Sequence, residues 1–450
     1  GDVYKRQAYF CQDAFLNQLG VSPTFNLLTS VMDDMRPENK YLHLMDEQEA
    51  ITKAQALLNR QGDANVSPLA VYRHAAKADS VQQRRPNVVL IMMESMSSKL
   101  MKHFGQSETL TPFLDSLYTR SISFRNFYSA GIHTNHGLYA TLYSFPAMMK
   151  RNLMKGSVIP RYSGLPTVLK ENGYYNLFFM THEGQYDNMN AFFRTNGYDE
   201  VFSQEDYPAD KVVNSFGVQD DFLYDYAIPV LNQRAATGQP FFATLLSISN
   251  HPPYVIPPFF HPKTSEPEMQ IVEYADWALR QFFEEARKQP WFDNTIFVLE
   301  GDHGKLVGDA ECELPESYNH IPLMIYSSRI HPEEKNTFGG QVDIQPTILG
   351  LLNIDYLQNN FGVDLLKEER PCMFYTADNM IVGRNDTLLY LYNYETQQEF
   401  TYHIDNGKLK AVPMDDRFLP LKEYSFSMLQ SAEFLVKHGK TVNSVPFTQQ

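Results

Sequence analysis

The chain has 450 residues, of which 43% are hydrophobic and 20% charged. This is the composition of a folded globular protein, and it argues against a disordered or fibrous chain. The 38 Lys and Arg residues are outnumbered by 53 Asp and Glu, which gives a net charge of −15. Because such an acidic chain repels nucleic acid and has no dense basic cluster, we expect no nucleic-acid partner.

The cysteines and the apolar runs say little about the compartment. Cys11, Cys312 and Cys372 are too few and too scattered for a disulfide framework, and none belongs to a Cys-x-x-Cys pair. No apolar run reaches the ~18 residues of a membrane span, and no secretory signal pattern is visible. Since the chain begins with Gly1 and not Met, we expect it to be the soluble part of a longer protein.

The first segment, residues 1 to 85, is polar and favours helix. Ala50, Ala54, Leu57 and Leu58 fall on one face of a helix at the spacing of an amphipathic segment. We therefore expect a helical lead-in that packs on a domain or links it to something upstream.

From Pro86 onward, short apolar runs alternate with helical patterns. Continuous apolar runs of this length are typical of strands buried on both faces. The expected strands are 87–93, 174–180, 241–248, 295–299 and 321–326, and the expected helices are 111–120, 220–234 and 270–288. This alternation predicts an α/β sandwich with a mostly parallel central sheet over residues 86 to 380.

The tail has a different pattern. Runs 387–394, 398–404 and 408–412, with an Asp405-Asn406-Gly407 turn between the last two, are typical of antiparallel strands. A last helix is expected at 421–438. The sequence therefore predicts a small C-terminal antiparallel α+β subdomain over residues 381 to 450.

Acids and histidines follow the expected strands. In an open parallel sheet, ligands bind outside the carboxyl ends of the strands, so these positions are candidates for one shared site. They are Glu94 after the first strand, Thr181-His182-Glu183 after the second, Asn250-His251 after the third, and Asp302-His303 after the fourth.

The motif Gly301-Asp302-His303-Gly304 is the strongest indication of a metal-binding site. A carboxylate and an imidazole suit a divalent cation such as Mn²⁺, Zn²⁺ or Mg²⁺, and Glu94 is the natural third ligand. Two plainer interpretations remain: Asp302 and His303 as ordinary turn residues, and Glu94 as an acid at a helix start.

A candidate nucleophile lies in Gly131-Ile132-His133-Thr134-Asn135-His136-Gly137, just before a helical pattern. A hydroxyl at a helix N-terminus faces unpaired N–H groups that favour an anion, and a metal would ease its ionisation. Thr134 could instead be only an N-cap. His133 and His136 could be ligands, substrate donors or surface residues.

Taken together, these motifs resemble a known family. The order and spacing of Glu94-Ser95, the Gly131 to Gly137 segment, Asn250-His251-Pro252-Pro253-Tyr254 and Gly301 to Gly304 are similar to those of the lipoteichoic acid synthase-type, sulfatase-like phosphoglycerol transferases. These belong to the alkaline phosphatase superfamily. The resemblance covers residues 86 to 380 and implies the sulfatase/alkaline-phosphatase-like fold.

The resemblance also implies a site and a setting. A single Mn²⁺, with Mg²⁺ or Zn²⁺ as alternatives, would be held by Glu94, Thr134, Asp302 and His303, and Thr134 would be the nucleophile. His251 would bind the phosphoryl group or assist the leaving group, and His182, Tyr186, Asn188 and His133 are the further substrate-binding candidates.

The domain would lie on the extracytoplasmic face of the bacterial cytoplasmic membrane, anchored by a segment outside this chain. A phospholipid such as phosphatidylglycerol would be the donor, and a glycan or lipid the acceptor.

One departure from the family pattern bears on the substrate. Tyr186 and Asn188 stand where synthases of the Gram-positive type carry Trp and Arg, and an amide cannot clamp a phosphate bidentately. Polymer synthesis is therefore open to question. A sulfatase is excluded because Thr134 cannot supply its Cys or Ser nucleophile, and a phosphoethanolamine transferase is disfavoured by the three cysteines. A phosphodiesterase or phosphatase and a non-catalytic envelope binding domain remain alternatives.

Overall fold

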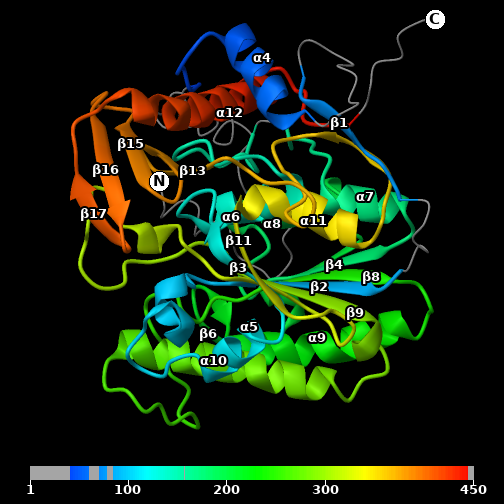
Figure 1. The fold of residues 1–450 in the computed structure, drawn as a ribbon. Helices are drawn as coiled ribbons and strands as arrows, with labels where there is room; N and C mark the ends of the chain where they lie inside the picture. The colour runs from blue at the N-terminus through cyan, green and yellow to red at the C-terminus, as the bar shows by residue number, and fades with distance from the viewer. Residues whose placement is uncertain (1–40, 60–69, 79–84, 157, 444–450) are drawn as a thin grey trace, which may run out of the picture.

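A computed structural model describes residues 41–59, 70–78, 85–156 and 158–443. The predictions for residues 1–40, Cys11 among them, lie outside the described residues. At the centre is an eight-stranded sheet in the order β11-β3-β10-β9-β2-β8-β4-β5 (Figure 1). Its strands are β2 (Asn87–Met93), β3 (Ile122–Tyr128), β4 (Tyr175–Phe179), β5 (Glu200–Phe202), β8 (Phe241–Leu246), β9 (Thr295–Gly301), β10 (Leu323–Tyr326) and β11 (Glu333–Gly340).

All strands of this sheet run in one direction except β10. β2 pairs in parallel with β8 and β9, whereas β10 is antiparallel to both β9 and β3. The carboxyl ends of β2, β3, β4, β8 and β9 therefore meet at one edge. The prediction of a mostly parallel sheet is confirmed, and each of the five strands predicted within it is present.

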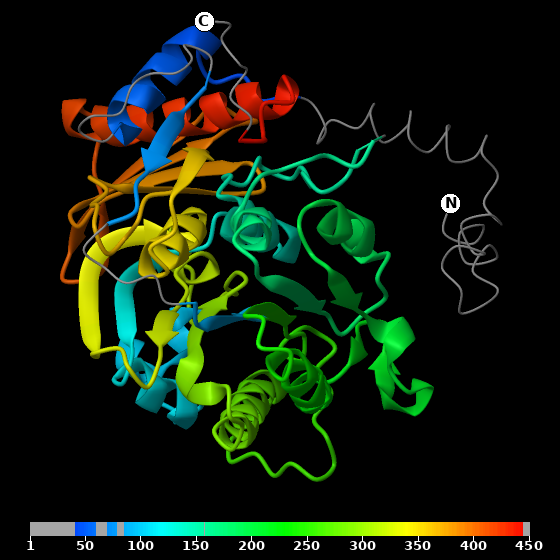
Figure 2. The same ribbon diagram turned by 90° about the vertical axis from the view of Figure 1, so that its right-hand side faces the viewer.

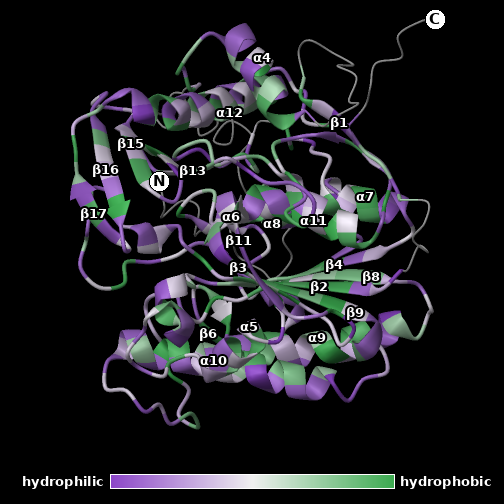
Figure 3. Ribbon diagram, viewed as in Figure 1, coloured by the Kyte–Doolittle hydropathy of each residue, from purple (hydrophilic) through white to green (hydrophobic). Residues whose placement is uncertain are grey.

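Two layers of helices cover the sheet, because its central strands are apolar on both faces (Figure 3). In β2, Val88, Leu90 and Met92 share one core with α6, while Val89 and Ile91 share the other with α10. The first layer contains α6 (Thr134–Tyr143), α7 (Leu165–Glu171), α8 (Met189–Thr195) and α11 (Ile344–Leu351). The second contains α5 (Pro112–Tyr118), α9 (Asp220–Ala235) and α10 (Pro267–Ala286).

Some strands carried no apolar run and were not predicted. β3 has the sequence ISFRNFY and β11 the sequence EEKNTFGG, so polar and charged side chains interrupt both. They nevertheless pair in parallel at the edge of the sheet. A short antiparallel pair, β6 (Val212–Asn214) with β7 (Gly217–Val218), lies outside the main sheet.

A second, five-stranded antiparallel sheet forms the C-terminal part, in the order β13-β14-β15-β16-β17. Its strands are β13 (Met373–Ala377), β14 (Met380–Arg384), β15 (Leu388–Asn393), β16 (Glu399–Asp405) and β17 (Lys408–Ala411), and α12 (Leu419–Lys437) packs on it. This sheet begins at Met373, ahead of the expected boundary at 381, because β13 pairs with β14 and not with the central sheet.

The described residues before β2 dock onto the C-terminal half of the chain. α4 (Glu47–Leu58) lies against α12, and β1 (Tyr72–Ala75) pairs antiparallel with β12 (Tyr356–Asn359) (Figure 2). The predicted apolar face of α4 was wrong at one position: Leu57 is 43% exposed and Ile51 is buried in its place. Among the described residues, none of the helices combines the length and apolar content needed to span a bilayer.

Candidate active site

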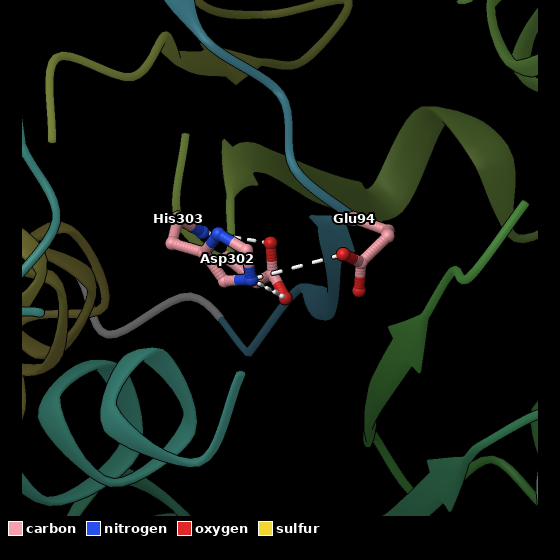
Figure 4. A group of neighbouring side chains, drawn as sticks. All are labelled: Glu94, Asp302 and His303. Atoms are coloured by element: carbon pink, nitrogen blue, oxygen red, sulfur yellow. Dashed lines mark hydrogen bonds and ion pairs between the residues drawn. The ribbon is translucent and has the colours of Figure 1, made fainter. Parts of the chain in front are cut away.

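Three side chains converge at the carboxyl edge of the central sheet. Glu94 directly follows β2, and Asp302 and His303 directly follow the neighbouring strand β9. One potential ligand atom from each of them lies within 4.8 Å of the others, and Figure 4 shows the side chains facing one another. We call Glu94, Asp302 and His303 the acidic cluster below.

The two carboxylates are buried, and each has one oxygen without a partner among the described residues. Ser95 Oγ donates to Glu94 Oε1 at 2.6 Å, and the backbone N–H groups of Ser95 and His303 donate to Asp302 Oδ1 at 2.8 and 2.7 Å. Glu94 Oε2 and Asp302 Oδ2 accept nothing. Since buried polar atoms are normally paired, these two oxygens are suited to bind a cation.

The imidazole of His303 is oriented to add a nitrogen to the same spot. Its Nδ1 lies 2.8 Å from the carbonyl oxygen of Gly304, which assigns the proton to Nδ1 and leaves the lone pair on Nε2. Nε2 is 3.7 Å from Glu94 Oε1 and 3.6 Å from Asp302 Oδ2. These separations are too long for hydrogen bonds. The two carboxylates and the imidazole form a donor set suited to a divalent cation.

Electrostatics within the acidic cluster also favour a bound cation. Burial raises the pKa of Glu94 well above its usual value, and the neighbouring charge of Asp302 raises it further. The backbone can approach closely here because position 304 is Gly: a Cβ there would lie 2.0 Å from the carbonyl oxygen of Ser317.

Thr134 is the first residue of α6, which enters the site from β3. The N-cap of α6 is His133, so the interpretation of Thr134 as a simple N-cap is wrong. Among the described residues, the backbone N–H groups of Thr134 and Asn135 donate to no backbone or side-chain acceptor, as expected in the first turn of a helix.

Three contacts fix α6 against the end of β9. A Cβ at Gly137 would lie 2.2 Å from the carbonyl oxygen of Asp302, so only glycine allows the first turn this close. Thr141 Oγ1 donates to Glu300 Oε1 at 2.5 Å. Gln341 accepts from the N–H of Ala130 at 2.9 Å and donates to the carbonyl oxygen of Asp302 at 2.7 Å.

The two histidines that flank Thr134 are both outside the acidic cluster. His133 Nε2 lies 2.7 Å from Asp378 Oδ1, in the turn between β13 and β14, so it ties the start of α6 to the C-terminal sheet. His136 is fully buried, which excludes the surface alternative, and burial lowers its pKa to about 3. His136 is therefore neutral.

The residues after β4 lie near α6 and the acidic cluster: Asn135 Nδ2 donates to Asp187 Oδ2 at 3.4 Å, and burial together with the charges of Asp187 and Glu94 raises the pKa of Tyr186. His182 is buried with its ring centroid 4.7 Å from that of Tyr186, which is 46% exposed. The side-chain amide of Asn188 donates to the carbonyl oxygen of Met154 at 3.1 Å. This bond engages the amide nitrogen that was expected to contact substrate.

His251 follows β8 at the same edge of the sheet. Its Nδ1 lies 2.6 Å from the carbonyl oxygen of Pro252, which assigns the proton to Nδ1 and leaves Nε2 as the second nitrogen. The ring packs on Phe216, with centroids 4.1 Å apart. His251 and Phe216 line a small hollow with Val213 and Val255.

Sequence reasoning missed a linked pair beside the acidic cluster. Asn250 Nδ2 donates to the carbonyl oxygens of Glu94 and Ser95 at 3.1 and 3.2 Å, and Lys305 Nζ donates to Asn250 Oδ1 at 2.7 Å. Burial lowers the pKa of Lys305 to about 8, against the opposing effect of Glu268 and Glu94. Asn250 belongs to the Asn250-to-Tyr254 motif of the sequence analysis, whereas no sequence pattern indicates a role for Lys305.

The fold and the acidic cluster together define a protein of the alkaline phosphatase superfamily. A crystal structure of a protein of this superfamily from Vibrio parahaemolyticus superposes with a TM-score of 0.78 at 25% identity, covering 89% of this chain and 98% of that one. The lipoteichoic acid synthase LtaP from Listeria monocytogenes superposes with a TM-score of 0.70 at 20% identity, covering 87% and 98%.

The chain belongs to the sulfatase family, whose model matches residues 86–354. Among curated proteins it is similar to lipoteichoic acid synthase 2 of Bacillus subtilis, with 25% identity over 315 residues, or 63% of this chain and 47% of that protein. Lipoteichoic acid synthase 1 of the same organism is 26% identical over 354 residues, or 72% and 54%. The chain thus spans about half the length of the curated relatives it matches.

Proposed function

We propose that this chain is a metal-dependent phosphoryl-group transferase that uses Thr134 as its nucleophile. It moves phosphoglycerol from a phospholipid such as phosphatidylglycerol to a glycan or lipid acceptor, on the extracytoplasmic face of the bacterial cytoplasmic membrane. The observation that carries the proposal is the acidic cluster, with its two unpaired buried oxygens beside the start of α6. The similarity to named lipoteichoic acid synthases supports the choice of phosphoglycerol.

Glu94, Asp302, His303 and Thr134 are the residues that would hold the metal, with Mn²⁺ as the first choice and Mg²⁺ or Zn²⁺ as alternatives. The two unpaired carboxylate oxygens and the Nε2 lone pair of His303 fit such an ion, because they supply oxygen and nitrogen donors with no competing partner. When bound, the ion supplies positive charge for a phosphate group in an otherwise acidic protein.

Thr134 attacks the phosphorus through its Oγ1. Its place in the first turn of α6 puts the unpaired N–H groups of Thr134 and Asn135, and the positive end of the helix dipole, next to the phosphoryl oxygens. His251, at the end of β8, binds the phosphoryl group or assists the leaving group through Nε2. The phosphoryl group is then passed from Thr134 to the acceptor hydroxyl.

A phosphodiesterase is the second candidate, in which water is the acceptor. The residue at position 188 favours it, because an Asn that already donates to the carbonyl oxygen of Met154 offers no guanidinium to grip a second phosphate group bidentately.

The test incubates the protein with Mn²⁺ and phosphatidylglycerol vesicles and measures diacylglycerol. We expect release from the wild type, none from Thr134→Ala, and none from either after metal chelation. Thr237→Ala is the matched control, because Thr237 is exposed just ahead of β8, at the opposite edge of the sheet.

Three outcomes would revise the proposal. If Thr134→Ala released diacylglycerol as fast as Thr237→Ala, the nucleophile assignment would fail. Cleavage of a soluble phosphodiester without diacylglycerol release would retain the chemistry and favour the phosphodiesterase. If metal had no effect on any substrate, the non-catalytic binding domain would be the better account.

A further inference from the structure

Lys305 is a cation without a counter-ion at the edge of the acidic cluster. Its ammonium donates to Asn250 Oδ1 at 2.7 Å and lies 5.2 Å from the centroid of the Tyr254 ring. Among the described residues, no carboxylate oxygen lies within the 4.0 Å of an ion pair with it. Lysines elsewhere in this acidic chain do have such partners, including Lys155 with Asp187 and Lys170 with Asp199.

The position of the ammonium relative to the acidic cluster is set by Asn250. This side chain donates to the carbonyl oxygens of Glu94 and Ser95, while its own oxygen accepts from Lys305. The backbone of Lys305 is held as well, because its N–H donates to Ser97 Oγ at 2.8 Å. Lys305 is therefore fixed at both ends, with hydrogen-bonding capacity left on its ammonium.

Lys305 and Thr134 reach the acidic cluster from opposite faces of the sheet. Thr134 begins α6, which packs with Val88, Leu90 and Met92 of β2. Tyr254, under the ammonium of Lys305, packs instead with the core of α10 on the other face of β2. In phosphoryl transfer, the attacking and leaving oxygens are roughly in line across the phosphorus. A nucleophile on one face therefore puts the leaving oxygen toward the other.

We propose that Lys305 is a catalytic residue that stabilises the leaving oxygen. This inference rests on the proposed function. As the bond from Thr134 Oγ1 to phosphorus forms and the Thr134 proton passes to solvent, the bond from phosphorus to the leaving oxygen breaks. The electron pair stays on that oxygen, which accepts a hydrogen bond from the Lys305 ammonium and takes up a proton from water.

The alternative is that Lys305 only positions Asn250 and, through it, the strand end that carries Glu94. The two roles differ in how they respond to the leaving group. A cation on the leaving oxygen matters most when that oxygen is strongly basic, whereas a positioning residue affects all leaving groups alike.

The experiment compares wild type, Lys305→Met and Lys305→Arg on three phosphoglycerol diesters whose leaving alcohols are p-nitrophenol, trifluoroethanol and ethanol, in order of rising basicity. We expect Lys305→Met to lower kcat on the ethyl diester by about 100-fold, the usual effect of losing one such donor, and on the p-nitrophenyl diester by about threefold or less. Lys305→Arg should restore part of the loss on the ethyl diester. Lys410→Met is the control, since Lys410 is exposed on β17 of the C-terminal sheet.

Mn²⁺ affinity, measured by calorimetry, is the second readout. We expect it to be unchanged in Lys305→Met. An equal loss on all three diesters, a weaker Mn²⁺ affinity, or no loss at all would overturn the inference. The proposed function fails separately, if wild-type protein releases no diacylglycerol from phosphatidylglycerol while it still cleaves the soluble diesters. If the wild type cleaves neither phosphatidylglycerol nor the soluble diesters, the proposed function and the role of Lys305 are both wrong.

Discussion

At the scale of single residues, the acidic cluster brings two buried carboxylates close together, and the proposed cation would offset their charge. Glu94 and Asp302 are almost fully buried, and burial together with the charge of Asp302 raises the pKa of Glu94. Buried carboxylates that each keep one unpaired oxygen destabilise a fold unless something positive pairs with them. The unpaired oxygens at this point are therefore best understood as ligands.

Asp302→Asn tests this directly. The amide removes one negative charge and one anionic ligand, so Mn²⁺ should bind much more weakly and diacylglycerol release should stop. In thermal unfolding, Mn²⁺ should stabilise the wild type, by about 2.7 kcal/mol at a metal concentration of 100 times Kd. It should do so little or not at all for the variant.

The same thermal measurement on Asp199→Asn provides the control. Asp199 accepts from the backbone N–H of Asn176 near the start of β4, away from the acidic cluster. Its variant should keep the full Mn²⁺-dependent shift. A shift of wild-type size in Asp302→Asn would show that the metal binds elsewhere.

At the scale of elements, the important contact is that of α6 with β9. Thr134 and Asp302 come from segments far apart in the chain, and Gln341 joins them by bonding to Ala130 on one side and to the carbonyl oxygens of Gly301 and Asp302 on the other. The start of α6, which carries the proposed nucleophile Thr134, is thus held close to the acidic cluster. Misplacing a reacting group by about 1 Å can cost 100-fold in rate.

Gln341→Met should therefore lower activity beyond its effect on stability. The substitution leaves buried backbone groups unpaired, which costs about 1–3 kcal/mol in the free energy of unfolding, and frees α6 to shift. We expect kcat for diacylglycerol release to fall by about tenfold or more at a temperature where the variant is fully folded.

Gln345→Met separates the two effects. Gln345 is also buried and accepts from Ser144 and Asn360, but it has no bond to β9. This variant should lose stability while kcat stays close to that of the wild type. Equal loss of kcat in both variants would argue against a specific role for the Gln341 bridge.

At the scale of the whole molecule, the buried side chain of Arg370 joins α12 to the turn that contains Gln341. Arg370 bonds to both carboxylate oxygens of Asp343, to the carbonyl oxygen of Phe361 and to the hydroxyl of Tyr424 on α12. Asp343 ends the single turn that begins at Gln341. The C-terminal helix is therefore connected, through two side chains, to the residue that holds α6 in place.

Arg370→Met should destabilise the protein by about 3–5 kcal/mol, because it leaves the carboxylate of Asp343 buried without its partner. Urea unfolding followed by circular dichroism measures this loss. Arg417→Met is the contrasting variant: its ion pair with Asp415 is exposed, and its removal should leave the unfolding midpoint unchanged. Similar midpoints for the two variants would contradict the role given to Arg370.

The sequence predicted those parts of the fold and of the site that depend on local pattern. β2 was predicted because its six residues after Asn87 are all apolar, and the acidic cluster was found because it directly follows two apolar strands. β3 and β11 were not predicted, because their pairing is decided by neighbouring strands and not by their own composition.

The rest of the site depends on contacts between distant segments. Asn188 was expected at the substrate, yet the left-handed turn around Asp187 and Asn188 directs its amide to Met154. Lys305 belongs to no recognisable sequence pattern. Only its bond to Asn250, 55 residues away in the chain, shows that it lies beside the acidic cluster. Neither outcome can be derived from spacing.

The antiparallel direction of β10 has a consequence for how this site can be altered. Because β10 returns beside β9, the connection between them, residues 302 to 322, stays at one edge of the sheet and needs no crossover helix. Its length can therefore change without rethreading the sheet, and a Cβ at Gly308 would meet only open space. Longer or shorter segments could therefore be grafted around Gly308 while Asp302 and His303 stay where β9 puts them.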